Sequence, residues 1–412
     1  MWKKISNSLN NFQYTVWTEF TPLAIKHQAI NLGQGFPNFQ CPQFVKNALA
    51  EAANSNENQY CRPAGVPMLV EEIARVYGAK HNRKIDPMTE VAVCYGASEA
   101  LLNATMSILN PGDEVIVVDP SFDIYIPQIC ISGGIPIRVS LVPPNDDVSS
   151  WTIDFDKLEA AFTTKTKLFL FNTPNNPIGK VYTKEELEKI GRILEKWPNV
   201  GIIADEVYEH VIFDKRVHMS LADVGNLWER SLTLSSAGKL FSVTGWKTGW
   251  AVGGPDMIKN MVVSKLWSSF CSNTVCQGAV ARSLRIADQE FEGYSNYYEW
   301  ICKQYEDKRE RMKHILYNSN VIKVQPLLAE GGFFLVGKIM NDGDFIPKQY
   351  REGATLDFAF CRWLTVEHKI TAIPCSVFFS ESNSHFGTNF VRFALCKEFS
   401  DYDKVEKILI RN

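Results

Sequence analysis

The sequence predicts an α/β protein with a mostly parallel sheet covered by helices. Apolar, strand-like runs alternate with segments of helical apolar spacing across residues 45–280, and the runs are continuous enough to be buried on both faces. Residues suited to ligand binding follow these runs, at the sheet edge where such folds bind ligands. A chain of 412 residues is long enough for two domains with sizeable cores.

Composition narrows the class of protein. The net charge is −3, no long single-sign run appears, and we expect no nucleic-acid partner. No stretch is apolar enough for a transmembrane span, and Lys3 and Lys4 precede no apolar segment of a signal peptide, so we expect a cytoplasmic protein without a membrane partner. The ten cysteines lack paired C-x-x-C spacing, which indicates reduced thiols and no metal site.

Two glycine-containing segments precede the first strand of the predicted sheet. Residues 31–39 read N-L-G-Q-G-F-P-N-F, where glycines such as Gly35 allow another backbone or a ligand to approach closely. Alone, this segment would be read as an ordinary loop. Residues 58–67 read N-Q-Y-C-R-P-A-G-V-P and lie between helices predicted over residues 42–54 and 67–80.

A strand predicted over residues 91–95 runs directly into the start of a helix. A strand, a glycine turn and a helix N-terminus together present free N–H groups and a positive dipole end to a phosphate. The small residues Gly96, Ala97 and Ser98 would let an anion come close. The alternative is a simple strand-to-helix turn, and many such turns bind nothing.

Three further apolar runs each lead to a candidate ligand residue. The first leads to Phe122, whose ring could stack on a flat heterocycle or belong to the core. The second leads to two X-Pro pairs, whose rigid extended turn suits Asn176 if its amide must point one way. The third leads to Asp205, which is costly to bury unpaired, although a salt-bridged aspartate is the alternative. The runs span residues 114–118, 167–172 and 200–204.

Residues 235–250 (S-S-A-G-K-L-F-S-V-T-G-W-K-T-G-W) carry two lysines eight positions apart and no other charge. A lysine among small, hydroxyl and aromatic residues is costly unless its amine is neutralised or bonded. Lys239 could be neutralised as a Schiff base with an aldehyde, while Lys247 holds an anion at a fixed distance. The alternative is two surface lysines on a glycine-rich loop.

The C-terminal part is predicted to form a smaller α+β domain. Arg392 is the one charge in a strand-like run, and arginine suits bidentate binding of a carboxylate, although an edge arginine could face water. Residues 265–274 are predicted to begin a helix, and residues 283–317 to form one long helix that joins the domains. The predicted division is an arm that adds to the small domain (1–44), a large domain (45–310) and the C-terminal small domain (311–412).

Six segments in one order resemble the fold type I pyridoxal-phosphate aminotransferases over nearly the whole chain. The resemblance implies a seven-stranded, mostly parallel sheet, pyridoxal 5'-phosphate as cofactor, and a homodimer with sites at its interface. It is strongest for the subgroup called kynurenine–oxoglutarate aminotransferase, glutamine transaminase K or cysteine-S-conjugate β-lyase. The segments are N-L-G-Q-G-F-P, N-Q-Y, G-A-S-E-A-L, N-T-P-N-N-P-I-G, D-E-V-Y and the lysine run.

This resemblance implies a role for each candidate residue. Lys239 corresponds to the catalytic Schiff-base lysine, Asp205 to the partner of the pyridine nitrogen, and Arg392 to the residue that binds the substrate α-carboxylate. Tyr60 is expected to reach the cofactor phosphate of the partner subunit, and Phe270 is expected to reach the substrate pocket of the partner subunit. The other expected cofactor ligands are Ala97, Ser98, Phe122, Asn176, Tyr208, Ser236 and Lys247. The other expected substrate-binding residues are Trp17, Gly35 and Asn176.

The implied reaction moves the amino group of kynurenine, glutamine or another aromatic or sulfur amino acid to a 2-oxo acid in a ping-pong cycle. Lys239 is expected to remove the α-proton once the substrate amine has displaced it. A cysteine-S-conjugate β-lyase side activity is expected where the β-carbon bears a good leaving group. The alternatives are a methionine or aromatic aminotransferase without kynurenine preference, a lyase on the same fold, and a cofactor-binding regulator.

Overall fold

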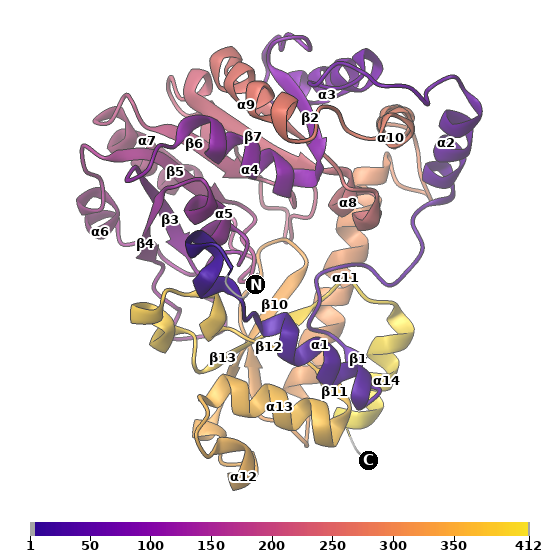
Figure 1. Ribbon diagram of the computed structural model, residues 1–412. Coiled ribbons are helices and arrows are strands. Elements are labelled where there is room, and N and C mark those ends of the chain that lie inside the picture. Colours follow the sequence, from indigo (N-terminus) through magenta and orange to yellow (C-terminus); the bar gives the residue numbers. More distant parts are fainter. Residues whose placement is uncertain (1–4, 411–412) are drawn as a thin grey trace.

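A seven-stranded sheet forms the centre of the larger part of the molecule (Figure 1). In the computed structural model, which describes residues 5–410, β8 is antiparallel to both of its neighbours and the other pairs are parallel. This arrangement confirms the predicted fold class. In sheet order the strands are β2 (Val91–Tyr95), β8 (Thr248–Gly253), β7 (Ser231–Ser236), β6 (Gly201–Asp205), β5 (Thr166–Asn172), β3 (Glu114–Asp119) and β4 (Ile135–Ser140).

The strands are apolar because helices cover both faces of this sheet. In β5, Leu168 and Leu170 belong to the core that includes residues of α4 (Gly96–Ile108) and α9 (Pro255–Ser268). Phe169 and Phe171, which alternate with these leucines, belong to a different core that includes residues of α7. This alternation is the period of two that a strand buried on both faces requires. Helix α7 (Lys184–Glu195) begins with the capping box of Thr183 and Glu186.

The smaller part is built around a four-stranded sheet and lies below the large sheet in Figure 1. The N-terminal arm joins it, because β1 (Ile30–Asn31) pairs in parallel with β11 (Ile370–Thr371) and α1 (Val16–Lys26) packs on α13 (Leu356–His368). These contacts support the predicted division of the chain, whose boundaries stay a prediction. In order, the four strands are β12 (Ile373–Pro374), β13 (Phe390–Ala394), β10 (Phe334–Ile339) and β9 (Val324–Pro326).

The prediction of one long helix over residues 283–317 was wrong. α10 (Thr274–Ala287) ends early, and α11 (Tyr297–Tyr317) is the helix that runs between the two parts (Figure 1). The connecting segment contains Glu292 with a φ of 50°, a left-handed conformation that cannot continue a right-handed helix. The side chain of Asn296 then caps α11 by accepting a backbone N–H, so the break is built into the sequence.

The prediction that residues 265–274 begin a helix was also wrong. α9 ends at Ser268, and Phe270 has a φ of 65°, which a bulky residue adopts only in a turn. Asn273 caps the following helix by accepting the N–H of Cys276. As a result Phe270 lies in a connecting loop and is 43% exposed.

Some of the remaining helices pack on other helices, as α2 does on α10 and α12 on α13. α2 and α3 confirm the helices predicted over residues 42–54 and 67–80. Within residues 5–410, no helix combines the length and apolarity that crossing a membrane requires. The basic N-terminus, for which a signal peptide was not expected, includes residues 1–4 and so lies largely outside the described residues. The remaining α-helices are α2 (Gln43–Asn54), α3 (Pro67–Lys80), α5 (Tyr125–Ile131), α6 (Phe155–Ala160), α8 (Ala237–Leu240), α12 (Lys348–Arg351) and α14 (Phe399–Leu409), and the 3-10 helices are Asn7–Phe12, Leu221–Asp223, Trp228–Arg230, Thr244–Trp246, Asn341–Gly343, Ser376–Phe378 and Glu381–Phe386.

Candidate active site

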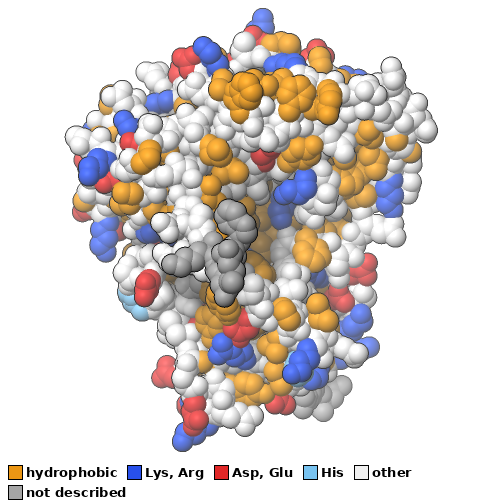
Figure 2. Space-filling view, viewed as in Figure 1, with side chains coloured by type: hydrophobic (Ala, Val, Ile, Leu, Met, Phe, Trp, Pro, Cys, Tyr) orange, Lys and Arg blue, Asp and Glu red, His pale blue; other side chains and the backbone are white. Residues whose placement is uncertain are grey.

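A cavity of about 570 Å³ lies where β5 and β6 end, between the large sheet and the smaller part. Figure 2 shows this face of the molecule hollowed at its centre, with hydrophobic side chains inside the hollow. The arm, the large sheet and the C-terminal strands all contribute to the lining. The structure thereby brings together most of the candidate residues, namely Trp17, Gly35, Ala97, Ser98, Phe122, Asn176, Asp205, Tyr208, Ser236, Lys239, Lys247 and Arg392.

Lys239 lies in the short helix α8, directly after β7. Ser236 caps this helix by accepting the N–H of Gly238 at 3.1 Å, which fixes the turn that carries the lysine. The Nζ atom of Lys239 donates a hydrogen bond of 2.7 Å to the carbonyl of Gly35 in the N-terminal arm. Burial lowers the pKa of this amine to about 8, so near neutral pH more of it is the unprotonated nucleophile than in an exposed lysine.

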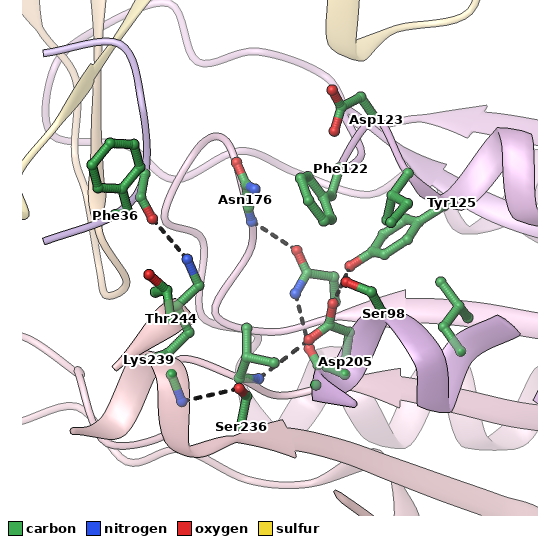
Figure 3. A pocket seen from close by; sticks show the side chains of 18 of the residues that line it. Phe36, Ser98, Phe122, Asp123, Tyr125, Asn176, Asp205, Ser236, Lys239 and Thr244 are labelled. Atoms are coloured by element: carbon green, nitrogen blue, oxygen red, sulfur yellow. Dashed lines mark hydrogen bonds between the residues drawn. The ribbon is translucent and has the colours of Figure 1, made fainter. Parts of the chain in front are cut away.

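Asp205 is the last residue of β6 and is 8% exposed. Its Oδ2 accepts a hydrogen bond of 2.6 Å from the hydroxyl of Tyr125, and its Oδ1 accepts the N–H of Val207 at 3.3 Å (Figure 3). Burial raises the pKa of the Asp205 carboxyl above its ordinary value. A cationic N–H donor in the cavity would stabilise the ionised form, because it would replace the lost hydration.

The N-terminus of α4 forms one end of the cavity together with Lys247. Gly96 has a φ of 74°, which favours glycine, and a Cβ at this position would lie only 3.1 Å from the Nζ of Lys247. Lys247 itself has a φ of 51° and forms no ion pair with any residue in the described chain. An unpaired cation beside a helix N-terminus and the lining residues Ser98 and Ser236 is a site suited to a phosphate.

Asn172, the last residue of β5, ties two parts of the site together. Its Nδ2 donates to the backbone carbonyl of Asp205 at 2.8 Å, and its Oδ1 accepts the backbone N–H of Asn176 at 2.7 Å. The proline-rich turn is thereby fixed relative to the neighbouring strand. Neither Asn172 nor Tyr125 was predicted from the sequence. Their positions in the sequence could have indicated them as site residues, since Asn172 ends an apolar strand and Tyr125 follows Phe122 by three residues.

Arg392 lies in β13 and is buried, with 1% of its surface exposed. Its Nη1 donates to the Oδ1 of Asn176 at 2.9 Å and its Nη2 donates to the carbonyl of Gly33 at 2.7 Å. The ring of Phe334 lies 4.0 Å from the guanidinium carbon. Burial lowers the pKa of Arg392, because no carboxylate of the described residues pairs with it. A carboxylate from outside the chain would complete this site.

A tryptophan and an aspartate form the outer wall of the cavity. Trp17, from α1, donates through Nε1 to the Oδ2 of Asp123 at 2.7 Å, and the guanidinium carbon of Arg392 lies 5.6 Å from the indole ring. Asp123 was not predicted from the sequence, because its partner lies 106 positions away. Phe36 lines the same cavity, and Figure 3 shows it on the side opposite Asp123.

Tyr60 and Phe270 are the two predicted site residues that do not line the cavity. Tyr60 is 86% exposed and Phe270 is 43% exposed. Their rings contact each other edge to face, with centroids 5.4 Å apart. The structure therefore presents them as a pair on the surface of the chain.

The residues of the cavity fit pyridoxal 5'-phosphate. Lys247 and the start of α4 suit its phosphate, the Asp205 carboxylate suits its ring nitrogen, and the low pKa of Lys239 suits its aldehyde. Two further polar groups have no hydrogen-bond partner among residues 5–410, namely the Nδ2 of Asn176 and the hydroxyl of Tyr208, and both residues line the cavity. These groups suit the phenolic oxygen of the cofactor.

Comparison with known proteins agrees with this chemistry. Residues 27–399 match the family model for aminotransferase class I and II. A kynurenine–oxoglutarate transaminase from Dictyostelium discoideum is 38% identical over 99% of this chain and 96% of its own length. Among solved structures, Bna3p of Saccharomyces cerevisiae, described as a proposed kynurenine aminotransferase, has a TM-score of 0.91 and 32% identity, covering 99% of this chain and 98% of its own. YbdL of Escherichia coli, for which a methionine aminotransferase function was identified, has a TM-score of 0.87 and 32% identity, covering 99% of this chain and all of its own. The chain therefore belongs to the class I and II aminotransferases, enzymes that depend on pyridoxal 5'-phosphate and act on amino acids and 2-oxo acids.

Proposed function

We propose that this enzyme moves the α-amino group of kynurenine, glutamine or another aromatic or sulfur amino acid to a 2-oxo acid. The observation that carries the proposal is Arg392, a buried cation that lacks a carboxylate partner in the described chain and lies between aromatic rings. A guanidinium in this setting is suited to the α-carboxylate of an amino acid, and the rings of Trp17 and Phe334 suit an aromatic side chain. The names of the kynurenine–oxoglutarate transaminases at 33–38% identity support the same substrate class.

In this proposal three residues bind and orient the substrate. Arg392 holds the α-carboxylate, and its hydrogen bond to Asn176 fixes the plane of the guanidinium. Asn176 is itself fixed through the side chain of Asn172. The α-carbon is then held close to the amine of Lys239, whose hydrogen bond to the arm is exchanged for contacts in the occupied site.

In this proposal Lys239 transfers the proton. When bound, pyridoxal 5'-phosphate supplies an electron sink to the carbon that loses its proton. The Nζ atom of Lys239 takes the α-proton and returns it within the same site, and its pKa of about 8 suits both directions near neutral pH. Asp205, at the end of β6, would hold the ring nitrogen of the cofactor, and its negative charge would keep that nitrogen protonated.

A single half-reaction tests the proposed function. Addition of kynurenine or glutamine to the holoenzyme, without any 2-oxo acid, is expected to bleach the visible cofactor band within the first turnover and to release one equivalent of the corresponding 2-oxo acid. Stopped-flow absorbance measures the rate for each amino acid and so ranks the substrates. A band that stays unchanged with every aromatic, sulfur and amide amino acid would overturn the proposal.

A methionine or aromatic aminotransferase without kynurenine preference is the second candidate. It is favoured by the likeness to the Escherichia coli protein with a methionine aminotransferase function. Equal or faster bleaching by methionine than by kynurenine would select it. Cysteine S-conjugates extend the same test, because loss of a thiol from the β-carbon yields pyruvate and ammonia in addition to any transamination product.

We further propose that two copies of the chain assemble with their sites at the interface. Tyr60 and Phe270 contact each other on the surface, and Trp267, at the end of α9, is 84% exposed. Large aromatic side chains exposed on a surface, such as this contacting pair and Trp267 three positions before Phe270, are typical of the apolar centre of an interface. We propose that Tyr60 and Phe270 complete the cavity of the partner subunit.

Trp267→Asp is expected to weaken this dimer by at least about 30-fold in Kd, because it places a charge at the centre of an apolar interface. Trp267 is 84% exposed in the single chain, so the fold of the subunit does not depend on it. Sedimentation velocity across a concentration series measures the change. The control is Val148→Asp, a charge at a residue that is 75% exposed in a different loop. Equal dissociation of both variants would contradict this placement of the interface.

A cytoplasmic location is part of the same proposal. All ten cysteines are free thiols, and five of them are buried. Unpaired cysteines at this density are typical of proteins in a reducing compartment. Co-fractionation of the native protein with a cytosolic marker tests this location, and recovery in a secreted or organellar fraction would contradict it.

A further inference from the structure

We propose that Asp123 selects the substrate side chain, favouring groups that donate a hydrogen bond and disfavouring groups that carry a carboxylate. This inference rests on the proposed function. It assigns Asp123, which the reaction itself does not use, as a specificity-determining residue in the wall of the cavity. The chemical class it selects is a neutral side chain ending in an amide or an arylamine.

One oxygen of Asp123 is already used, and the other is available. Oδ2 accepts the indole N–H of Trp17 at 2.7 Å, which orients the carboxylate. Oδ1 accepts no hydrogen bond from residues 5–410, and Asp123 is partly exposed within the cavity. Figure 3 shows Asp123 next to Phe122, at the far end of the cavity from Ser236 and Lys239. A carboxylate with a free oxygen at this end is a strong hydrogen-bond acceptor for an incoming group.

The position of Asp123 corresponds to the direction of the substrate side chain. Arg392 fixes the α-carboxylate, and the indole ring of Trp17 lies 5.6 Å from its guanidinium carbon. The Nε1 atom of the same indole donates to Asp123. A side chain that extends from the α-carbon along the face of Trp17 therefore ends beside the carboxylate of Asp123.

The charges of the cavity make this selection effective. Among the described residues that line the cavity, the cations are Lys239, Lys247 and Arg392. Each of these is already assigned to the aldehyde, the phosphate or the α-carboxylate. A second carboxylate on the substrate would consequently meet Asp123 without a compensating cation, and like charges placed together are strongly disfavoured. An amide or arylamine N–H would instead donate to Oδ1.

Glutamine and glutamate provide the first test, because they differ only in the amide and the carboxylate. In the wild-type holoenzyme we expect glutamine to have the higher kcat/KM by about 100-fold. Asp123→Asn removes the charge and keeps an oxygen that accepts the indole N–H. We expect it to reduce the glutamine-to-glutamate ratio by about tenfold or more, measured as two half-reactions on the same protein. An unchanged ratio would overturn the proposal.

Equilibrium binding gives a second measurement that does not depend on turnover. The probes are 4-(2-aminophenyl)-4-oxobutanoate and 4-phenyl-4-oxobutanoate, which differ only in the arylamine and lack the reacting amino group. Calorimetry with the wild-type holoenzyme is expected to show about tenfold tighter binding of the arylamine, and Asp123→Asn is expected to remove that preference.

Trp17→Phe distinguishes selection from simple positioning. This variant keeps an aromatic ring and removes the N–H that orients Asp123. If Asp123 acts only by holding the indole, Trp17→Phe will change the glutamine-to-glutamate ratio as much as Asp123→Asn, and the proposal is wrong. We expect a smaller change. Bleaching by phenylalanine, which has neither a donor nor a second carboxylate, reports transamination separately, so failure of the proposed function would be recognised as such.

Discussion

Lys239→Ala is expected to lower kcat/KM by about 10⁴-fold, the largest effect of any single substitution in this chain. The variant loses both the amine that attaches the cofactor and the base that moves the α-proton. The fold should be retained, because Lys239 lies in a short helix whose cap is formed by Ser236. The measurement is the rate of the first half-reaction with kynurenine, together with the intact mass after borohydride treatment, which adds the cofactor to the wild-type chain only.

Two controls separate the roles of Lys239. Lys239→Arg keeps a cation in the cavity but provides neither a nucleophile nor a base, so it should be as inactive as the alanine variant. Added ethylamine should restore part of the lost rate in Lys239→Ala, because a small amine can take the proton in the vacated space. Activity of Lys239→Ala within tenfold of the wild type would contradict the assignment of this lysine.

Asp205→Asn is expected to lower kcat by about 10²- to 10³-fold, or about 3–4 kcal/mol. The substitution preserves size but removes the charge that keeps the ring N–H protonated, so the electron sink is weakened. Burial already raises the pKa of this carboxyl, which means that the charge depends on the pairing it finds in the occupied site. The first half-reaction measures the loss, and the absorption spectrum of the cofactor in the resting enzyme reports the ring protonation directly.

Tyr125→Phe is the matched control for Asp205. It removes the 2.6 Å hydrogen bond to Oδ2 but leaves the negative charge in place. The loss in kcat should consequently be much smaller than in Asp205→Asn, on the order of tenfold. Equal losses in the two variants would mean that the orientation of the carboxylate, and not its charge, accounts for the effect.

The sequence carried enough information for the fold class and for most residues of the cavity. Residues such as Asp205 and Asn176 follow buried strands, so their meeting at one sheet edge could be predicted from the order of the strands. The contact between Trp17 and Asp123 could not, because it depends on how the arm docks on the rest of the chain. The break between α10 and α11 was missed although Asn296 caps the second helix, since Glu292 within the break is an ordinary helix former and its left-handed conformation is set by the turn.

The surface position of Tyr60 and Phe270 could not be predicted from the sequence pattern. Apolar spacing alone cannot separate an aromatic residue that packs in the core from one that packs on a second copy of the chain. Tyr60 and Phe270 were assigned to the partner subunit by resemblance, and the structure adds that they contact each other on the outside of the molecule. Their role stays a prediction until the oligomer is measured.

The pairing of β1 with β11 has a consequence for the order in which the enzyme becomes active during synthesis. The arm with Trp17 and Gly35 leaves the ribosome well before β11 and Arg392 are made. Until α13 and β11 have been made, the apolar face of α1, formed by Val16, Phe20 and Ala24, lacks both of these partners. The nascent chain therefore exposes an amphipathic segment for most of its translation, and the substrate pocket closes only in the last step of folding.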